Sequence, residues 1–306
     1  MTWRLFRWAW RLKSPLYIGT TPAGALNRCR LYVPARTLWA ALTAELVRHE
    51  RDEEQVTADE YESMGKDLKK KYRFTYLYPA RQVDGEWRAY LPAFESGRGL
   101  VWRQENAPEK ETLRDRVFRG RILYTRPGTA IDPWTDTAAE GSLRETECLQ
   151  PRWRSASKRD EGPVALVGYV LVRNAEGFAQ DDVGKISPIK SLLLGGDTRY
   201  GLGRLELDSV AAVDPQSGIF GNEVDVVKGD PIVQSSVVLA HASGEFGMAG
   251  ALELLRGWHA GQQDLISDKP LWVPGSRVAQ LGVEAGFSIN ELGLWHREAP
   301  PRSKLA

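Results

Sequence analysis

The chain has 306 residues, of which 26% are charged and 42% hydrophobic, and its 41 Lys/Arg and 40 Asp/Glu residues leave a net charge of +1. This length supports one large domain with insertions or two smaller domains. No apolar run approaches the roughly 18 residues of a membrane span, and the N-terminus lacks the cleavage site of a secretory signal, so we expect a cytoplasmic protein with no membrane partner.

The charges are distributed unevenly along the chain. Residues 1–204 carry 34 basic and 27 acidic side chains, a net of +7, whereas residues 205–306 carry 7 and 13, a net of −6. Residues 1–44 contain seven basic residues and no acid. This distribution predicts a polyanion-binding surface on the first part of the chain. An ordinary solvated basic face is the alternative.

Residues 3–12 alternate in a way that predicts a β-strand. Phe6, Trp8 and Trp10 fall on one side, and Arg7 and Arg11 fall on the other. Sheets that bind RNA combine exposed cations and aromatic rings in this way. The arginines fit solvent-exposed positions of an edge strand equally well.

Residues 34–49 follow with a helical pattern. Pro34 suits the first turn, where its missing N–H group has no helical partner, and Leu38, Leu42 and Leu46 mark one face. The free backbone N–H groups of a helix N-terminus bind phosphate. We therefore expect Arg36 and Thr37, in that first turn, to contact RNA.

The middle of the chain reads as insertions around one buried strand. We expect a charged helix over 50–71, a hairpin that turns at Asp84-Gly85, and a basic strand over 116–125. Residues 126–153 lack core periodicity, which predicts a surface hairpin or an irregular loop. Residues 164–172 (VALVGYVLV) are almost continuously apolar and predict a central buried strand.

A glycine-rich loop follows a short apolar segment. We expect a short helix over 187–194 that ends at Gly195-Gly196, and a strand from Leu205. Glycines allow close backbone approach to a sugar-phosphate, while arginine supplies charge and tyrosine a stacking face. A plain turn with a glycine cap is the alternative. The loop residues predicted to bind RNA are Gly195, Gly196, Thr198, Arg199, Tyr200, Gly201, Gly203 and Arg204.

The last third contains a connection over 215–231 and then weaker signals. We expect a strand over 232–242, a short helix over 249–258 and a strand over 271–273. The four histidines of the chain are scattered without metal-site spacing, and Cys29 and Cys148 have no C-x-x-C partner. The sequence therefore predicts no metal and no cofactor.

Three segments and the glycine loop resemble one family in the same chain order. Residues 14–19 (SPLYIG) are similar to its "sPLhIG" segment, and residues 33–38 (VPARTL) to its "iPGSS" helix entry, with Ala35 where the family has glycine. Residues 129–147 (TAIDPWTDTAAEGSLRETE) resemble its "aIDR.TgtA.eGaL...E" thumb. This is the RAMP superfamily, the ferredoxin-like RNA-binding subunits of CRISPR effector complexes.

The resemblance implies an α+β, ferredoxin-like (RRM-like) domain over 1–213, with insertions at about 50–110 and a thumb at about 126–153. Residues 214–306 would be a C-terminal extension or a degenerate second half. The implied function is binding of guide RNA (crRNA) in a type III-like CRISPR effector complex in antiviral defence, with target RNA and other effector subunits as partners. A backbone position and an end-capping position both fit. In the thumb, Ile131 and Trp134 would lie beside the guide.

Cleavage is not expected. Target-cutting members of the family use an aspartate between the first two motifs, but residues 20–32 contain no Asp or Glu, and the nearest polar candidate is Asn27. A neutral amide replaces a carboxylate poorly in metal binding or proton transfer. An endoribonuclease is the alternative, and a carboxylate or histidine beside the glycine loop would favour it. A ferredoxin-like structural protein without RNA would lack a basic groove under the loop.

Overall fold

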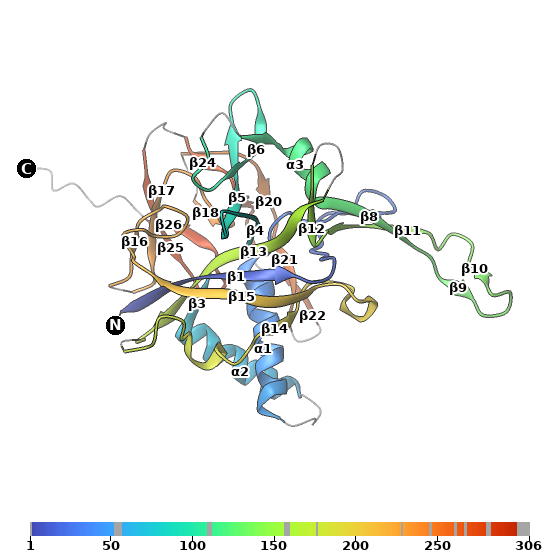
Figure 1. The fold of residues 1–306 in the computed structure, drawn as a ribbon, viewed down its shortest axis with the longest axis horizontal. Helices are drawn as coiled ribbons and strands as arrows, with labels where there is room; N and C mark the ends of the chain where they lie inside the picture. The colour runs from blue at the N-terminus through green and yellow to red at the C-terminus, as the bar shows by residue number, and fades with distance from the viewer. Residues whose placement is uncertain are drawn as a thin grey trace, which may run out of the picture.

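The computed structural model describes residues 2–51, 57–108, 112–155, 160–175, 177–227, 229–244, 247–259, 262–265, 268–279 and 283–298. The fold is α+β, as predicted, and most of its elements are strands (Figure 1). Within these ranges there are three α-helices, and none has the length and apolar character needed to cross a membrane.

The main sheet is built around β1 (Trp3–Leu12), which pairs antiparallel with β13 (Asp160–Arg173) on one side and β15 (Arg204–Val213) on the other. Residues 164–172 of β13 are all buried, which confirms the predicted central strand. The full strand order is β14 (Ser191–Leu193), β15, β1, β13, β4 (Tyr78–Val83), β5 (Glu86–Glu95), β6 (Gly99–Gln104) and β7 (Leu113–Arg114), with β3 (Tyr72–Phe74) and β12 (Arg152–Arg154) also paired to β13.

The two sides of β1 have different roles. Trp8 is buried and stacks on Phe74 with ring centroids 5.9 Å apart. Arg7, on the basic side, donates to the Trp87 carbonyl at 2.6 Å and to Glu105 at 2.9 Å. Because β1 is a central strand and Arg7 is bound within the protein, neither the RNA-reading interpretation nor the edge-strand interpretation holds for this arginine.

Two helices pack together on one face of the main sheet. Helix α1 (Ala35–Glu50) follows Pro34 as predicted, and α2 (Ala58–Lys71) begins with a capping box between Thr57 and Glu60. Gly65 of α2 lies under the Trp39 ring, and a Cβ there would come within 2.6 Å of it. Of the charged run over 50–71, residues 52–56 lie outside the described residues, and residues 58–71 form a helix that is packed on one face and solvated on the other.

Several sequence predictions were wrong at the level of single elements. The expected strand over 116–125 is mostly helix α3 (Asp115–Ile122), because Phe118 and Ile122, four residues apart, are both fully buried on one helical face. The expected helix over 187–194 is absent from that range: a 3-10 turn at Gly184–Ile186 precedes it, and strand β14 occupies its second half. There Leu192 and Leu194 are buried and Leu193 is 48% exposed, which is the two-residue period of a strand.

Two predictions in the last third also need correction. The expected helix over 249–258 is replaced by β20 (Leu252–Glu253) and β21 (Arg256–His259), where short strand pairings take the place of helical turns. The expected strand over 232–242 divides into β17 (Ile232–Ser235) and β18 (Ala242–Ser243), because the chain crosses from β25 to β26 between them.

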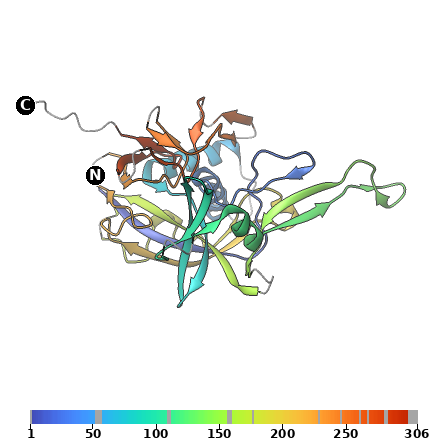
Figure 2. The same cartoon turned by 90° about the horizontal axis from the view of Figure 1, so that it is seen from above.

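A long hairpin projects from the body of the molecule (Figures 1 and 2). Its arms are β8 (Leu123–Gly128) and β11 (Arg144–Leu149), and β9 (Ile131–Asp132) and β10 (Thr137–Ala138) lie toward its tip. The short strand β2 (Leu26–Asn27) runs parallel along β11. Residues 126–149 of the predicted segment thus belong to this hairpin, whereas Arg152–Arg154 form β12 of the main sheet, where Trp153 is buried. We call residues 123–149 the thumb.

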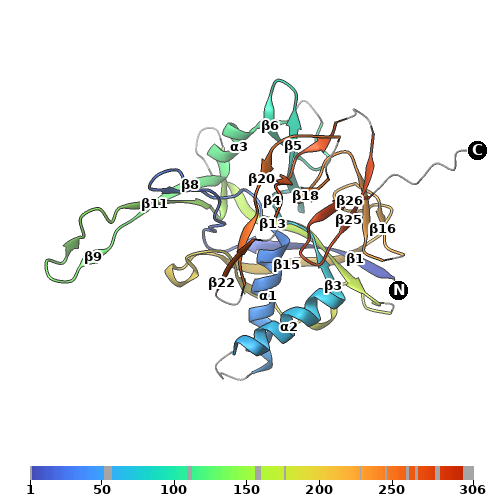
Figure 3. The ribbon, with the colours of Figure 1, turned by 180° about the vertical axis from the view of Figure 1, so that it is seen from behind.

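The last third forms a second sheet on the same side of the main sheet as α1 and α2 (Figures 2 and 3). The two regions share one hydrophobic core. The order of the second sheet is β16 (Val224–Asp225), β17, β25 (Ala285–Ile289), β26 (Trp295–Arg297), β18, β23 (Leu271–Trp272) and β20; beside it β19 (Met248–Ala249) pairs with β24 (Arg277–Val278), and β21 with β22 (Gln262–Leu265).

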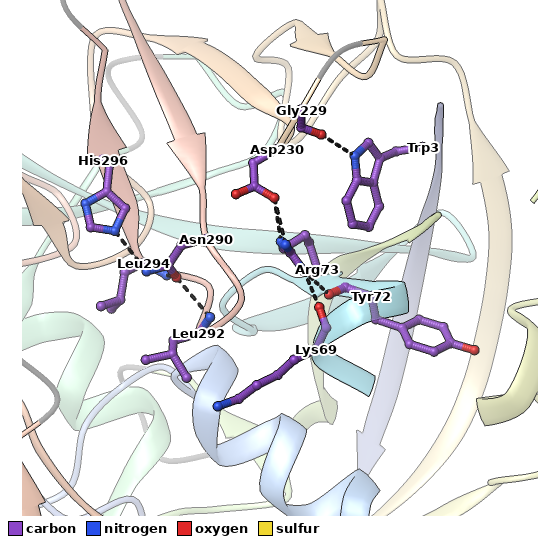
Figure 4. Close-up of polar contacts among 10 residues, drawn as sticks. All are labelled: Trp3, Lys69, Tyr72, Arg73, Gly229, Asp230, Asn290, Leu292, Leu294 and His296. Atoms are coloured by element: carbon purple, nitrogen blue, oxygen red, sulfur yellow. Dashed lines mark hydrogen bonds and ion pairs between the residues drawn. The ribbon is translucent and has the colours of Figure 1, made fainter. Parts of the chain in front are cut away.

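Polar contacts join the two regions at the start of β1 (Figure 4). The indole N–H of Trp3 donates to the Gly229 carbonyl at 2.8 Å. Arg73 bonds Asp230 through two nitrogens at 2.7 and 3.0 Å, and its guanidinium lies 5.0 Å from the centre of the Trp3 ring. The last third is therefore fixed against the first by directional contacts as well as by apolar packing.

Candidate nucleic-acid interface

The glycine loop is the connection of a β-hairpin between β14 and β15. It contains a 3-10 turn at Thr198–Tyr200 between two residues in the left-handed region, Asp197 (φ 57°) and Gly201 (φ 82°). A Cβ on Gly203 would lie 1.9 Å from the Leu194 carbonyl oxygen. Gly203 is therefore required by the hairpin itself.

Residues 15–18 pack against the glycine loop and hydrogen-bond to it. The backbone N–H groups of Gly203 and Gly196 donate to the carbonyls of Pro15 and Tyr17 at 2.7 and 2.9 Å. A Cβ on Gly195 would come within 2.4 Å of the Tyr17 carbonyl oxygen. Gly195 and Gly203 thus serve internal packing, which places the loop firmly on the SPLYIG segment. At Gly201 the space is open, and only its positive φ favours glycine.

The loop touches the thumb through Tyr200. Arg126, on β8, donates to the Tyr200 carbonyl at 3.2 Å, and the guanidinium of Arg144, on β11, lies 5.4 Å from the centre of the Tyr200 ring. Tyr200 is 52% exposed, and Arg199 beside it is exposed. We call these four residues the loop–thumb cluster. Its cations can neutralise phosphate, and its exposed ring can stack on a base.

Arg204 lies differently from Arg199. Its guanidinium is exposed and pairs with Glu206 at 3.2 Å, while its backbone N–H donates to the Ser14 hydroxyl at 2.9 Å. A surface pair of this kind contributes little to stability and can be exchanged for a phosphate. Arg204 therefore remains accessible at the base of the loop.

A cavity of about 850 Å³ lies between the glycine loop, the N-terminus of α1 and the last third of the chain. It brings together four of the residues predicted to bind RNA: Arg36, Thr37, Gly195 and Gly196. The other charged groups in its lining are Arg30, Glu253 and Arg256. The glycine loop and the N-terminus of α1, which were predicted separately, thus line one cavity, and the last third contributes Glu253 to the same lining.

Glu253 is part of a buried polar chain. Arg30 donates to Glu253 Oε1 at 2.6 Å, and His241 Nε2 contacts the same oxygen. Tyr76 lies 2.7 Å from His241 Nδ1. The contacts fit a neutral imidazole that accepts at Nδ1 from the Tyr76 hydroxyl and donates from Nε2 to the carboxylate.

The electrostatics of this chain follow from burial and pairing. Burial lowers the pKa of His241, and the Glu253 carboxylate opposes that effect only in part. Burial alone would raise the pKa of Glu253, but the His241 hydrogen bond and the Arg30 charge outweigh it and lower this pKa to about 2. Glu253 is thus ionised at neutral pH beside a neutral histidine.

The predicted thumb residues lie away from this cavity. Ile131 and Trp134, 59% and 93% exposed, lie in the β9–β10 region toward the tip of the projecting hairpin (Figure 1). Asp132 orders the turn there by accepting from the Trp134 backbone N–H at 2.8 Å. The tip of the hairpin and the cavity are therefore separate surfaces.

Sequence reasoning missed Arg30, Arg126, Arg144, Glu253 and Arg256 as site residues. Arg126 had a usable signal, because basic residues flank both ends of the thumb segment. Arg30 and Glu253 are 223 positions apart, so no local pattern links them. Among the residues that the structure describes, no three His, Cys, Asp or Glu side chains are grouped so that they could hold a metal ion.

No protein-family model and no curated protein matches the sequence. Among solved structures, similar chains occur in type III-B Cmr-beta complexes. In a complex bound to cognate target RNA and AMPPnP, the similar chain is 14% identical, the match covers 89% of this chain and 85% of that chain, and the TM-score is 0.44. In a complex bound to cognate target RNA, the identity is 13%, the match covers 89% of this chain and 86% of that chain, and the TM-score is 0.46. In a third complex, in the apo state, the identity is 10%, the match covers 67% of this chain and 96% of that chain, and the TM-score is 0.36. At these values the similarity identifies no family and assigns no chemistry to this chain.

Proposed function

We propose that the chain is an RNA-binding subunit of a type III-like CRISPR effector ribonucleoprotein and that it holds guide RNA. In this proposal the strand passes the loop–thumb cluster and continues over the glycine loop toward the cavity. The observation that carries the proposal is the meeting of three separate sequence motifs at one surface. Tyr200 contacts both arms of the thumb, while Gly195 and Arg36 line the same cavity.

The strand order supports a ferredoxin-like core for the same proposal. Strands β15, β1, β13 and β4 are neighbours in that order, each antiparallel to the next, and α1 lies between β1 and β4 in the chain. A βαββαβ unit has this order. The 3-10 turn at Gly184–Ile186 stands where the second helix of that unit would be.

The identity of co-purifying nucleic acid tests the proposal. The chain would be expressed with a CRISPR array and the partner subunits, and the RNA recovered with it would be sequenced. We expect guide RNA to be enriched over total cellular RNA. Recovery of no RNA, or of RNA in proportion to its abundance, would contradict the proposal.

An endoribonuclease is the second candidate, and Glu253 is the observation in its favour, because this carboxylate lies in the same cavity as Gly195 and Gly196. Its pKa of about 2 makes it a weak proton acceptor at neutral pH, and general acid–base catalysis needs a pKa near the working pH. Among the described residues no three His, Cys, Asp or Glu side chains are grouped so that they could hold a metal ion, so we also expect labelled guide and target RNA to stay intact with Mg²⁺ or Mn²⁺. Metal-dependent cleavage lost in Asp197→Ala or Glu253→Gln would establish the enzyme instead.

A further inference from the structure

The cavity beside the glycine loop carries charges of both signs. Arg30, Arg36 and Arg256 line it, and so does Glu253. A phosphate is attracted by the arginines and repelled by the carboxylate. The lining therefore fits a ligand with an anionic part and, separately, neutral hydrogen-bond donors. Its volume of about 850 Å³ lies within the range of sites that enclose small organic ligands.

Glu253 is held as a fixed acceptor. Arg30 and His241 both contact Oε1, and a carboxylate offers about four acceptor positions, so capacity for further donors remains. A quarter of the Glu253 side chain (25%) is exposed, whereas His241 behind it is fully buried. The carboxylate is thus oriented before any ligand arrives, and a group that binds it has to donate.

We propose that the cavity encloses one nucleotide of the bound RNA strand and that Glu253 accepts a hydrogen bond from it. The donor is either the ribose 2′-hydroxyl or a base amino group, and both present the same chemistry to a carboxylate. The inference rests on the proposed function, because the strand reaches the cavity over Gly195 and Gly196. A hydrogen bond to Glu253 would make binding selective at one nucleotide, whereas the arginines of the site recognise only the charge of the phosphate backbone.

Binding of fluorescent single strands of about ten nucleotides tests the inference. The parent is an RNA of adenosine and cytidine. One arm replaces every amino-bearing base by its deaminated form, hypoxanthine or uracil, and the other removes every 2′-hydroxyl. We expect wild-type protein to bind one of these two about fivefold to tenfold more weakly than the parent. The arm that loses affinity identifies the donor.

Two variants connect that preference to the cavity. Glu253→Gln keeps the shape of the side chain and removes its charge, and Ala40→Phe places a ring in the cavity from α1 and leaves residue 253 itself unchanged. Both variants should bring the ratio of parent-strand to modified-strand affinity close to one. Glu223→Gln removes an exposed carboxylate outside the cavity and should leave the ratio unchanged.

The outcomes separate this inference from the proposed function. If wild-type protein binds the parent and both modified strands equally, or if the preference survives in both variants, Glu253 is a structural ion pair and the inference is wrong. If wild-type protein does not bind the parent RNA at all, the proposed function itself is wrong.

Discussion

Tyr200 connects the glycine loop to both arms of the thumb. Its carbonyl accepts from Arg126 and its ring faces the guanidinium of Arg144, while half of the side chain remains exposed. A base that stacks on this ring would extend an arrangement that already contains a cation. Tyr200 therefore both joins the glycine loop to the thumb and offers an exposed ring on which a base can stack.

Replacement of Tyr200 by alanine should therefore weaken RNA binding by about 1 to 3 kcal/mol, the contribution of one base-stacking aromatic ring. Fluorescence anisotropy with a short single strand measures the change. Tyr124→Ala, on the thumb arm, is the matched control and should change affinity less. Equal affinity of wild type and Tyr200→Ala would remove this ring from the binding surface.

The Glu253 pair predicts how stability depends on pH. The folded pKa of Glu253, about 2, lies below its ordinary value of 4.5, so the pair stabilises the fold fully above about pH 4.5 and loses this effect as pH falls toward 2. The difference between these two pKa values corresponds to about 3 kcal/mol. The lowered pKa of His241 acts in the same direction below its ordinary value of 6.5.

Denaturant unfolding of wild type and Glu253→Gln between pH 6 and pH 3 measures this effect. The stability advantage of wild type over the variant should shrink as the pH falls. Glu223→Gln corrects for the general loss of one carboxylate. An advantage that stays constant over this range would mean that Glu253 is not paired as the structure places it.

At the scale of elements, the thumb is a surface hairpin attached to a packed body. Its tip is closed by local hydrogen bonds: the hydroxyls of Thr129 and Ser142 lie 2.6 Å apart, and Ser142 accepts from the Ala130 N–H at 3.1 Å. The two arms are therefore already close where residues 132–141 leave and return. Little of the shared core depends on the tip.

Deletion of residues 132–141, with Ile131 joined to Ser142 through two glycines, should leave a folded protein. We expect its unfolding free energy to stay within about 1 kcal/mol of wild type, because loop length changes closure entropy only slowly. Assembly on guide RNA should be disturbed, since the deletion removes Trp134 and Ala138, the strand partner of Ile131. Circular dichroism and size-exclusion chromatography with guide RNA check both parts; an insoluble product would assign the segment to the core.

The elements that sequence alone predicted are those with a clear period. The buried β13, the α1 face and the Asp84-Gly85 hairpin follow from local patterns, and the structure confirms them. The segment 187–194 misled because three consecutive leucines fit a helix and a strand equally well, and pairing with β15 decided for the strand. Of the site, the loop and the start of α1 were predicted, but not the Arg30–Glu253 pair, which depends on the docking of the last third.

At the scale of the whole molecule, residues 214–306 complete the hydrophobic core and the hydrogen bonding of residues 1–213. Tyr76 and Tyr78 are both buried, and the last third supplies a hydrogen-bond partner for each hydroxyl. The Tyr76 hydroxyl lies 2.7 Å from His241 Nδ1, and the Tyr78 hydroxyl donates to the Leu239 carbonyl at 2.8 Å. Arg73, only 8% exposed, joins Asp230 and Trp3 at another point of the same boundary. The cavity exists only because these two regions are held together.

Arg73→Leu should therefore lower the unfolding free energy by about 2 kcal/mol, through loss of hydrogen bonds to a charged partner. Arg88→Leu is the control, because its partner Asp84 is 86% exposed and such surface pairs contribute less than about 1 kcal/mol. Urea unfolding measures both variants. Equal effects of the two substitutions would show that the Arg73 contact does not hold the regions together.

The salt dependence of RNA binding tests the central claim most directly. Each phosphate contact adds about 0.7 to the slope of log affinity against log salt for single strands. Arg199→Ala combined with Arg204→Ala should therefore reduce the slope by about 1.4 and weaken binding at all sequences. Arg48→Ala combined with Lys66→Ala removes the same charge from exposed positions on α1 and α2 and should leave the slope nearly unchanged. A slope that is the same in the loop variant as in wild type would contradict the account.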